Sequence, residues 1–137
     1  MIFDLCKRSI VDTNVISYIF NRHTLGILYK ARRQGRMLFT AAQTVKELRY
    51  GAFKAKWGAV RLSQLELLLE SFRIVQTTDL ICTKCAQIRV EARQKGLVLD
   101  LADAWIAATA LTLEIPLVTH NKKHFEFLEG MVIISES

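Results

Sequence analysis

Short apolar segments alternate with longer segments of helical periodicity, and this alternation constrains the fold more than any other feature of the sequence. The short segments are predicted strands at residues 9–12, 37–40, 73–76, 117–119 and 131–134. The longer segments are predicted helices at residues 24–34, 44–51, 62–72, 79–95 and 100–113. Strands that alternate with such helices form crossover units, which build a mainly parallel sheet covered on both faces. We therefore predict an α/β fold of three layers.

Capping residues predict where two of these helices begin. Thr44 is expected to cap the helix that carries Glu47, because a threonine hydroxyl accepts a hydrogen bond from the first helical turn. Thr78 or Asp79 is expected to cap a helix that ends before Gly96.

The composition fits one domain and a polyanionic partner. With 51% apolar residues the chain can bury a single core, so we predict one domain over residues 1–137. The net charge of +6 favours nucleic acid as a partner, with an acidic protein or a membrane surface as competitors. No segment approaches the ~20 apolar residues that span a bilayer, and charges interrupt residues 1–8 too early for a secretory leader. Cys6, Cys82 and Cys85 are an odd number that suits reduced thiols, so we expect a soluble cytoplasmic protein.

Polar side chains follow two of the predicted strands, and two acids lie on predicted helices. Asp12 ends the first strand, and Asn121 follows the fourth; Glu47 and Asp103 arrive from helices. In open parallel sheets the ligand crevice lies beyond the carboxyl ends of the strands. Carboxylates that converge there raise one another's pKa, and such a cluster usually holds a divalent cation. Metal-assisted chemistry on a phosphate is therefore the leading hypothesis.

These residues fall into segments that resemble the PIN-domain family, and within it the VapC-like toxin ribonucleases of bacterial toxin–antitoxin pairs. The matching segments, in the family's order, are residues 11–17 (VDTNVIS), 44–51 (TVKELRYG), 103–111 (DAWIAATAL) and 117–121 (LVTHN), with Phe125 and Gly130. The resemblance implies a Rossmann-like sheet of five parallel strands in the order 3-2-1-4-5. It also implies cleavage of RNA that depends on Mg²⁺ or Mn²⁺, a cognate antitoxin, and Asp12, Glu47 and Asp103 as the metal-binding acids.

The proposed roles extend to neighbouring polar residues. Asp12 is the expected central metal ligand and Asp103 the second, while Glu47 orients or deprotonates a water. Asn121 is expected to position a water from the opposite side of the crevice. Nucleic-acid contacts are assigned to Thr13, Asn14 and Arg49.

One position departs from the family pattern. His124 stands where the family usually has a further acid, three residues after Asn121. Its imidazole either binds metal, which would favour Mn²⁺ over Mg²⁺, or is a solvated loop side chain. Asp100 lies three residues before Asp103 and either replaces the missing acid or caps the helix. Ala42 also stands where the family commonly has a serine.

Several other features have a plain structural interpretation beside the functional one. Basic residues cluster in two places and either contact phosphates or form a solvated face: Lys30, Arg32, Arg33 and Arg36, then Lys46, Arg49, Lys54 and Lys56. Tyr50, Phe53 and Trp57 either stack on bases or pack against protein. The pair Cys82 and Cys85 lacks a second pair at zinc-ligand spacing, so structural thiols are the better interpretation.

Three functions compete on the sequence alone. The first is a metal-dependent endoribonuclease toxin that acts on RNA, with a transfer RNA as one candidate, together with an antitoxin partner and a homodimeric state. The alternative is a catalytically weak PIN-like module that binds RNA or protein because the fourth acid is missing. The third is a phosphatase that works through a phosphorylated Asp12. That enzyme type carries an aspartate two residues later, where this chain has Asn14.

Overall fold

The structure is a computed structural model that describes residues 8–22, 26 and 37–136. Cys6, the basic residues between 30 and 36 and the predicted helix at 24–34, apart from Gly26, lie outside the described residues.

The described strands form one parallel sheet in the order β3-β2-β1-β4-β5. The strands are β1 (Arg8–Val11), β2 (Met37–Ala41), β3 (Arg73–Val75), β4 (Leu117–Val118) and β5 (Ile133–Ile134). This order confirms the topology that the family resemblance implied. Strand β1 lies at the centre, and the chain order reverses beside it, so the carboxyl ends of β1 and β4 lie at the edge where ligands of open parallel sheets bind.

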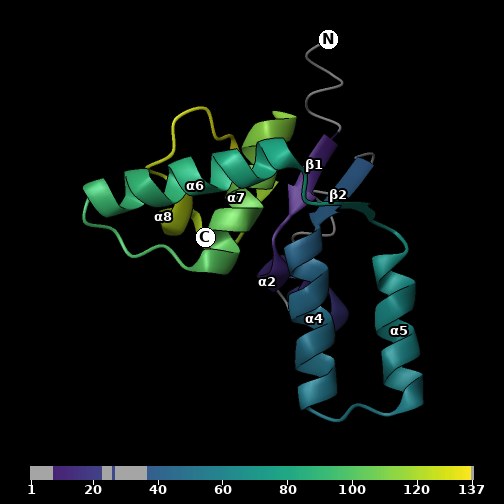
Figure 1. The fold of residues 1–137 in the computed structure, drawn as a ribbon. Helices are drawn as coiled ribbons and strands as arrows, with labels where there is room; N and C mark the ends of the chain where they lie inside the picture. Colours follow the sequence, from purple (N-terminus) through teal and green to yellow (C-terminus); the bar gives the residue numbers. More distant parts are fainter. Residues whose placement is uncertain (1–7, 23–25, 27–36, 137) are drawn as a thin grey trace.

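Helices connect the strands and cover both faces of the sheet (Figure 1). They are α2 (Thr13–Phe20), α4 (Ala42–Lys54), α5 (Ala59–Leu69), α6 (Asp79–Gln94), α7 (Leu101–Leu113) and α8 (Lys122–Phe125). None of the helices in the described part of the chain is both long and apolar enough to cross a membrane.

The alternation of side chains along the strands creates two cores. Ile10 and Leu117 face α6 and α7, while Val11 and Val118 face α2. All of these side chains are at most 5% exposed, and each contributes roughly 1.5–3 kcal/mol through burial. Because the sheet is covered on both faces, successive residues of the central strands are buried, including the polar residues Ser9 and Thr40. Val11 and Val118 are register partners, so the residues that follow them, Asp12 and Thr119, lie next to each other at the ends of β1 and β4.

The start of α4 differs from the sequence prediction. Strand β2 runs directly into α4, which begins at Ala42, so Thr44 is a buried residue inside the first turn and not its cap. The cap position is Ala41, which offers no side-chain hydrogen bond. At α6 the prediction is confirmed: Thr78 Oγ1 accepts from the backbone N of Ile81 at 3.3 Å.

Helices α4 and α5 lie side by side as a helical hairpin (Figure 1). Their shared core consists of Val45, Ala52, Leu65 and Leu69. Trp57, in the connection, stacks on Phe20 of α2 at 5.2 Å between ring centroids. The hairpin is therefore packed against α2 at the connection between its two helices. Of the two described cysteines on α6, Cys82 is exposed and Cys85 buried, and both are free thiols.

Candidate metal centre at the carboxyl edge of the sheet

Asp12 is a buried carboxylate at the centre of the site. It directly follows β1 and occupies the cap position of α2, and it is 2% exposed. Its Oδ1 accepts a hydrogen bond from the backbone N of Thr13 at 2.7 Å, and its Oδ2 accepts one from Thr119 Oγ1 at 2.7 Å. Burial raises the pKa of Asp12 to about 6, and the negative charges of Asp103 and Glu47 add to this rise. The two hydrogen bonds oppose the rise without cancelling it.

Glu47 reaches the site from the first turns of α4 and is held there by threonines. Thr13 Oγ1 donates to Glu47 Oε1 at 2.8 Å and lies 3.1 Å from Thr44 Oγ1. Since Thr13 has one hydroxyl proton, Thr44 supplies the proton of the second contact. Thr13 therefore connects the carboxyl end of β1 to α4, and it orients one oxygen of Glu47.

Asp103 comes from the first turn of α7 and pairs with His124 of α8. His124 Nδ1 lies 3.0 Å from Asp103 Oδ2, with 54% of the His124 side chain and 14% of the Asp103 side chain exposed. A carboxylate only accepts, so Nδ1 carries the proton in this contact. The pKa of Asp103 is raised by burial and by the charge of Asp100, while His124 lowers it. His124 is thus neither an isolated solvated residue nor a side chain free to turn away from Asp103.

The loop after β4 contributes further residues to the site at this edge of the sheet. The backbone N of Asn121 donates to Thr119 Oγ1 at 3.0 Å, and Thr119 in turn donates to Asp12. The Asn121 side chain is half-buried, and its role in positioning a water stays a prediction. Thr119 is the site residue whose role sequence reasoning did not assign. The signal was present, because Thr119 follows Val118 as Asp12 follows Val11, and these two valines are register partners.

Two predicted nucleic-acid residues lie apart from this hydrogen-bond network. Asn14 is exposed on α2. Arg49 donates two hydrogen bonds to Glu66 of α5, from Nε to Oε2 at 3.1 Å and from Nη2 to Oε1 at 2.7 Å. This pairing holds the guanidinium against the α4–α5 hairpin, and phosphate contacts by Arg49 and Asn14 stay predictions. Asp100 occupies the cap position of α7 but makes no side-chain cap hydrogen bond.

The donor set suits a hard cation that keeps part of its water shell. Among the residues that the structure describes, no three side chains of Asp, Glu, His or Cys are grouped closely enough to hold one ion together. Within that same part, Glu47 Oε2 and Asp103 Oδ1 accept no hydrogen bond, so both retain free lone pairs. Mg²⁺ is typically bound by one or two carboxylates and several waters, which matches the charge-coupled but separate acids here.

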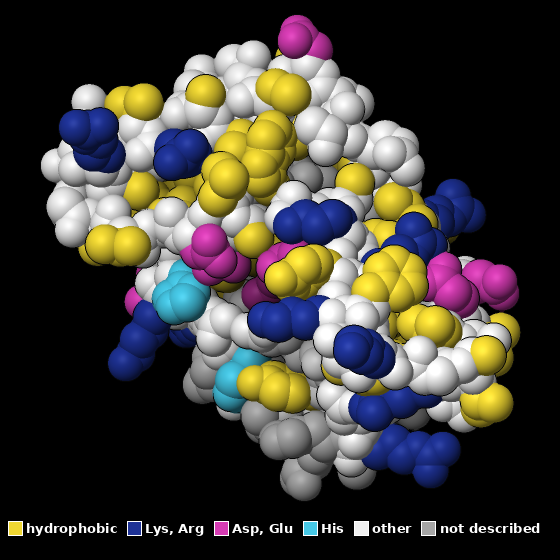
Figure 2. All heavy atoms as spheres, turned by 60° about the horizontal axis from the view of Figure 1, so that its bottom comes forward, with side chains coloured by type: hydrophobic (Ala, Val, Ile, Leu, Met, Phe, Trp, Pro, Cys, Tyr) yellow, Lys and Arg dark blue, Asp and Glu magenta, His cyan; other side chains and the backbone are white. Residues whose placement is uncertain are grey.

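The face that carries the site is mixed in charge (Figure 2). Acidic side chains lie together near the centre of this view, a histidine lies beside them, and Lys and Arg side chains surround them at intervals. A negative centre with positive surroundings is the arrangement expected for a site that binds both a cation and a phosphate.

The topology and the acids at its carboxyl edge define an α/β protein with an acidic site at the point where strand order reverses. Residues 9–128 match the PIN domain, and the chain belongs to the PIN domain family.

The chain is similar to several proteins named VapC and to solved VapBC structures. It is similar to ribonuclease VapC2 of Rickettsia felis, with 27% identity over 129 residues that cover 90% of this chain and 93% of the relative. It is also similar to ribonuclease VapC2 of Haemophilus influenzae strain Rd, with 28% identity over 116 residues, or 85% and 88% of the two chains. The structure of VapBC-1 from nontypeable H. influenzae aligns with a TM-score of 0.80 and 26% identity over 93% of this chain and 97% of that one. The promoter-bound VapBC2 complex of R. felis shares the fold, with a TM-score of 0.84, 23% identity, and 95% and 99% coverage.

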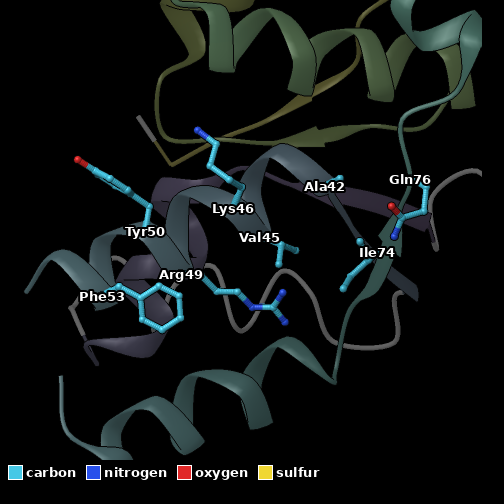
Figure 3. Close-up of a pocket in the computed structure, with 8 residues that line it drawn as sticks. All are labelled: Ala42, Val45, Lys46, Arg49, Tyr50, Phe53, Ile74 and Gln76. Atoms are coloured by element: carbon cyan, nitrogen blue, oxygen red, sulfur yellow. The ribbon is translucent and has the colours of Figure 1, made fainter. Parts of the chain in front are cut away.

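A second hollow, distinct from the acids, lies along α4 and β3 (Figure 3). This α4 groove has a volume of about 510 Å³ and is lined by Ala42, Val45, Lys46, Arg49, Tyr50, Phe53, Ile74 and Gln76. Tyr50 and Phe53 are 61% and 63% exposed, so they do not pack a core as one interpretation of the sequence held. Lys46 and Arg49 leave α4 in opposite directions in Figure 3. Exposed aromatic side chains beside basic ones are typical of contact surfaces.

Proposed function

We propose that this protein is a divalent-metal-dependent endoribonuclease and the toxin of a toxin–antitoxin pair. The observation that carries the proposal is Asp12, a carboxylate buried in a hydrogen-bond network and charge-coupled to Asp103 and Glu47. Burial of a charge without a nearby cation is unfavourable, and strongly raised acid pKa values mark functional sites. The names of the relatives supply the reaction class, since those proteins are called VapC ribonucleases.

In this proposal Asp12, Asp103 and Glu47 would hold Mg²⁺ or Mn²⁺ in part through waters of the ion, because these side chains are not grouped closely enough for all three to bind one ion directly. When bound, the cation supplies a water of lowered pKa and positive charge beside the phosphodiester. The chain's own groups orient the acids: Thr119 and the Thr13 amide fix both oxygens of Asp12. The Thr13 hydroxyl engages one oxygen of Glu47 and leaves the other to accept the proton of the attacking water.

His124 orients Asp103 in the same way that Thr13 orients Glu47. Its Nδ1 engages Asp103 Oδ2 and leaves Oδ1 for the cation. At the fourth position of the family pattern this chain therefore has a histidine that positions an acid, and we propose no second acidic ligand set.

A protein partner is supported by the α4 groove and by solved structures to which the chain is similar, which include VapBC-1 of nontypeable H. influenzae and a toxin–antitoxin complex from Klebsiella pneumoniae. We propose a cognate antitoxin as that partner, and self-association as a homodimer. The test is size-exclusion chromatography with light scattering of the chain alone and after co-expression with the neighbouring reading frame. A monomer that forms no complex with that product would contradict both the proposed antitoxin and the proposed homodimer.

The second candidate is a catalytically weak binding module. His124 contacts one oxygen of Asp103, whereas an acid at position 124 would add a negative charge to the site. The two functions separate in one experiment. Purified protein is incubated with total cellular RNA in Mg²⁺, Mn²⁺ or a chelator, and the ends of any products are mapped. The ribonuclease requires metal-dependent cleavage that disappears in Asp12→Asn. RNA binding without cleavage, together with no heat of Mn²⁺ binding at millimolar ion, would instead favour the binding module.

A further inference from the structure

The segment between β4 and Phe125 carries a cluster of cationic side chains that the proposed function does not use. A hollow of about 360 Å³ is lined by His120, Asn121, Lys122, Lys123, His124 and Glu126. Lys122 and Lys123 are exposed, and in the part of the chain that the structure describes neither forms an ion pair or a hydrogen bond. The two lysines outnumber the one acid of this lining, Glu126, so the hollow is cationic.

Both ends of this segment are attached to the acidic site. At one end the backbone N of Asn121 donates to Thr119 Oγ1, which donates to Asp12. At the other end His124 contacts Asp103 at 3.0 Å. Lys122 and Lys123 lie between these attachments, so their positions relative to the acids are set by short, direct contacts. Because β4 is parallel to β1, the segment leaves the sheet at the same edge as Asp12.

An RNA strand needs positive charge at this place. Asp12, Glu47 and Asp103 repel a polyanion, and a bound cation offsets only part of that charge. Phosphate contacts from lysines beside the acids would hold the strand while the scissile phosphate lies over them. Here carboxylates and lysines lie near one another, but among the described residues the lysines form no ion pairs with them. A bound cation would neutralise the carboxylates, and the phosphates of an RNA strand would neutralise the lysines.

Two basic residues of α4, Arg49 and Lys54, are less suited to this task. Arg49 is held by Glu66 in a two-point ion pair. Lys54 lies over the Tyr50 ring at 5.8 Å, and it is roughly 10 Å farther along α4 than Glu47, at 1.5 Å per residue. The segment after β4 is therefore the better place for phosphates next to the cleaved bond.

We infer that residues 120–124 form a subsite for backbone phosphates of the RNA, flanking the phosphodiester that is cut, with Lys122 and Lys123 as the phosphate-binding side chains. The inference rests on the proposed ribonuclease function and adds the residues that hold its substrate. Contacts of this kind are independent of base sequence and depend strongly on salt.

Binding is measured by the fluorescence anisotropy of a labelled single-stranded RNA oligonucleotide, in the Asp12→Asn protein so that the strand stays intact. The test variant adds Lys122→Gln and Lys123→Gln. The matched control instead adds Arg89→Gln and Arg93→Gln, which remove the same two charges from exposed positions of α6. Titrations run from about 50 to 300 mM KCl, the range over which phosphate contacts lose most of their affinity.

Loss of two phosphate contacts to a single strand should make the slope of log K against log salt shallower by about 1.4. At 0.1 M salt the same loss corresponds to roughly 25-fold weaker binding. The control should change affinity by less than about threefold, the scale of general charge effects. Glu126→Gln should strengthen binding, because it removes the acid of the hollow. Equal losses in the test and control variants would overturn the inference. So would an acidic peptide of matched charge that binds as tightly as RNA through the same lysines.

A cleavage assay with the protein that retains Asp12 distinguishes this inference from the proposed function. Lys122→Gln with Lys123→Gln should raise KM and leave kcat within about twofold, because the lysines bind ground state and transition state alike. A fall in kcat at unchanged KM would overturn the subsite. If the native protein cleaves no RNA in Mg²⁺ or Mn²⁺ while the lysine-dependent binding persists, the ribonuclease is rejected and the subsite stands.

Discussion

Replacing Asp12 by Asn should stabilise the metal-free protein while it abolishes RNA cleavage. Asn is nearly isosteric with Asp but uncharged, so the substitution removes the buried negative charge and keeps the shape of the side chain. The pKa of Asp12 lies at about 6 in the folded protein against an ordinary value of 3.8. Folding therefore favours the protonated form, and ionised Asp12 destabilises the folded state at neutral pH.

The size of this effect follows from the pKa difference. Each unit corresponds to about 1.36 kcal/mol, so a shift from 3.8 to about 6 costs about 3 kcal/mol above pH 6. The amide that replaces the Asp12 carboxylate would lose about 1 kcal/mol, because its NH₂ group meets a Thr119 hydroxyl that already accepts from Asn121. A net gain of about 2 kcal/mol remains, which corresponds to a rise in Tm on the order of 6 °C for a domain of this size.

The pH dependence of the free energy of unfolding provides a second test of the same prediction. Because the folded pKa is raised, the stability associated with Asp12 is fully present below about pH 4 and is lost as pH rises through 6. Titrating groups that are not charge-coupled to Asp12 contribute equally to both proteins. The difference in free energy of unfolding between Asp12→Asn and the native protein should therefore grow between pH 4 and 6 and level off above it.

The assay is urea unfolding followed by circular dichroism, in chelator, at half-unit steps from pH 4 to 8. Titration of Mn²⁺ into the native protein should then recover the lost stability, while the variant should not respond, since binding to the folded state raises stability by mass action. A difference that stays flat with pH, or a variant less stable than the native protein at pH 7 in chelator, would refute the reasoning.

Three further perturbations test the other members of the site. Thr119→Val removes the hydroxyl that donates to Asp12, so the pKa of Asp12 should rise further and kcat/KM should fall by roughly 10- to 100-fold. The pH profile of kcat/KM should shift to higher pH. Glu47→Gln should lose cleavage by at least about 100-fold with Tm unchanged, because the amide oxygen still accepts from the Thr13 hydroxyl; retained cleavage would exclude Glu47 as the proton acceptor. His124→Asp should tighten Mn²⁺ binding in calorimetry by adding a carboxylate beside the acids, whereas His124→Ala should weaken it; equal affinities would remove His124 from the site.

Local sequence patterns were sufficient to predict much of the framework. The strands were recognisable because β1 and β4 are buried on both faces and contain the short apolar segments Ile10–Val11 and Leu117–Val118. Asp12 was predictable as a site residue, because a polar side chain that ends such a strand must leave the sheet at its edge. The start of α4 was predicted wrongly, because a helix normally needs a capping side chain, and here β2 continues into α4 without a loop from which Thr44 could cap it.

Contacts between distant segments were beyond local patterns. The His124 contact with Asp103 depends on how α8 packs beside α7, and the sequence left His124 open between a metal ligand and a solvated residue. The pairing of Arg49 with Glu66 was not predicted, because nothing near Arg49 in the sequence indicates Glu66, which arrives only when α5 docks on α4. Surface pairing of this kind is set by tertiary geometry rather than by composition.

The bond between Thr119 and Asp12 joins residues 107 positions apart, so it has a consequence for synthesis. A ribosome that adds 5–20 residues per second needs about 5–20 s between incorporating one partner and the other. Throughout that interval the nascent polypeptide carries its first acid without the threonine that orients it. Translation products that stop before β4 lack this hydroxyl, so their Asp12 side chain can keep only the hydrogen bond from the Thr13 amide.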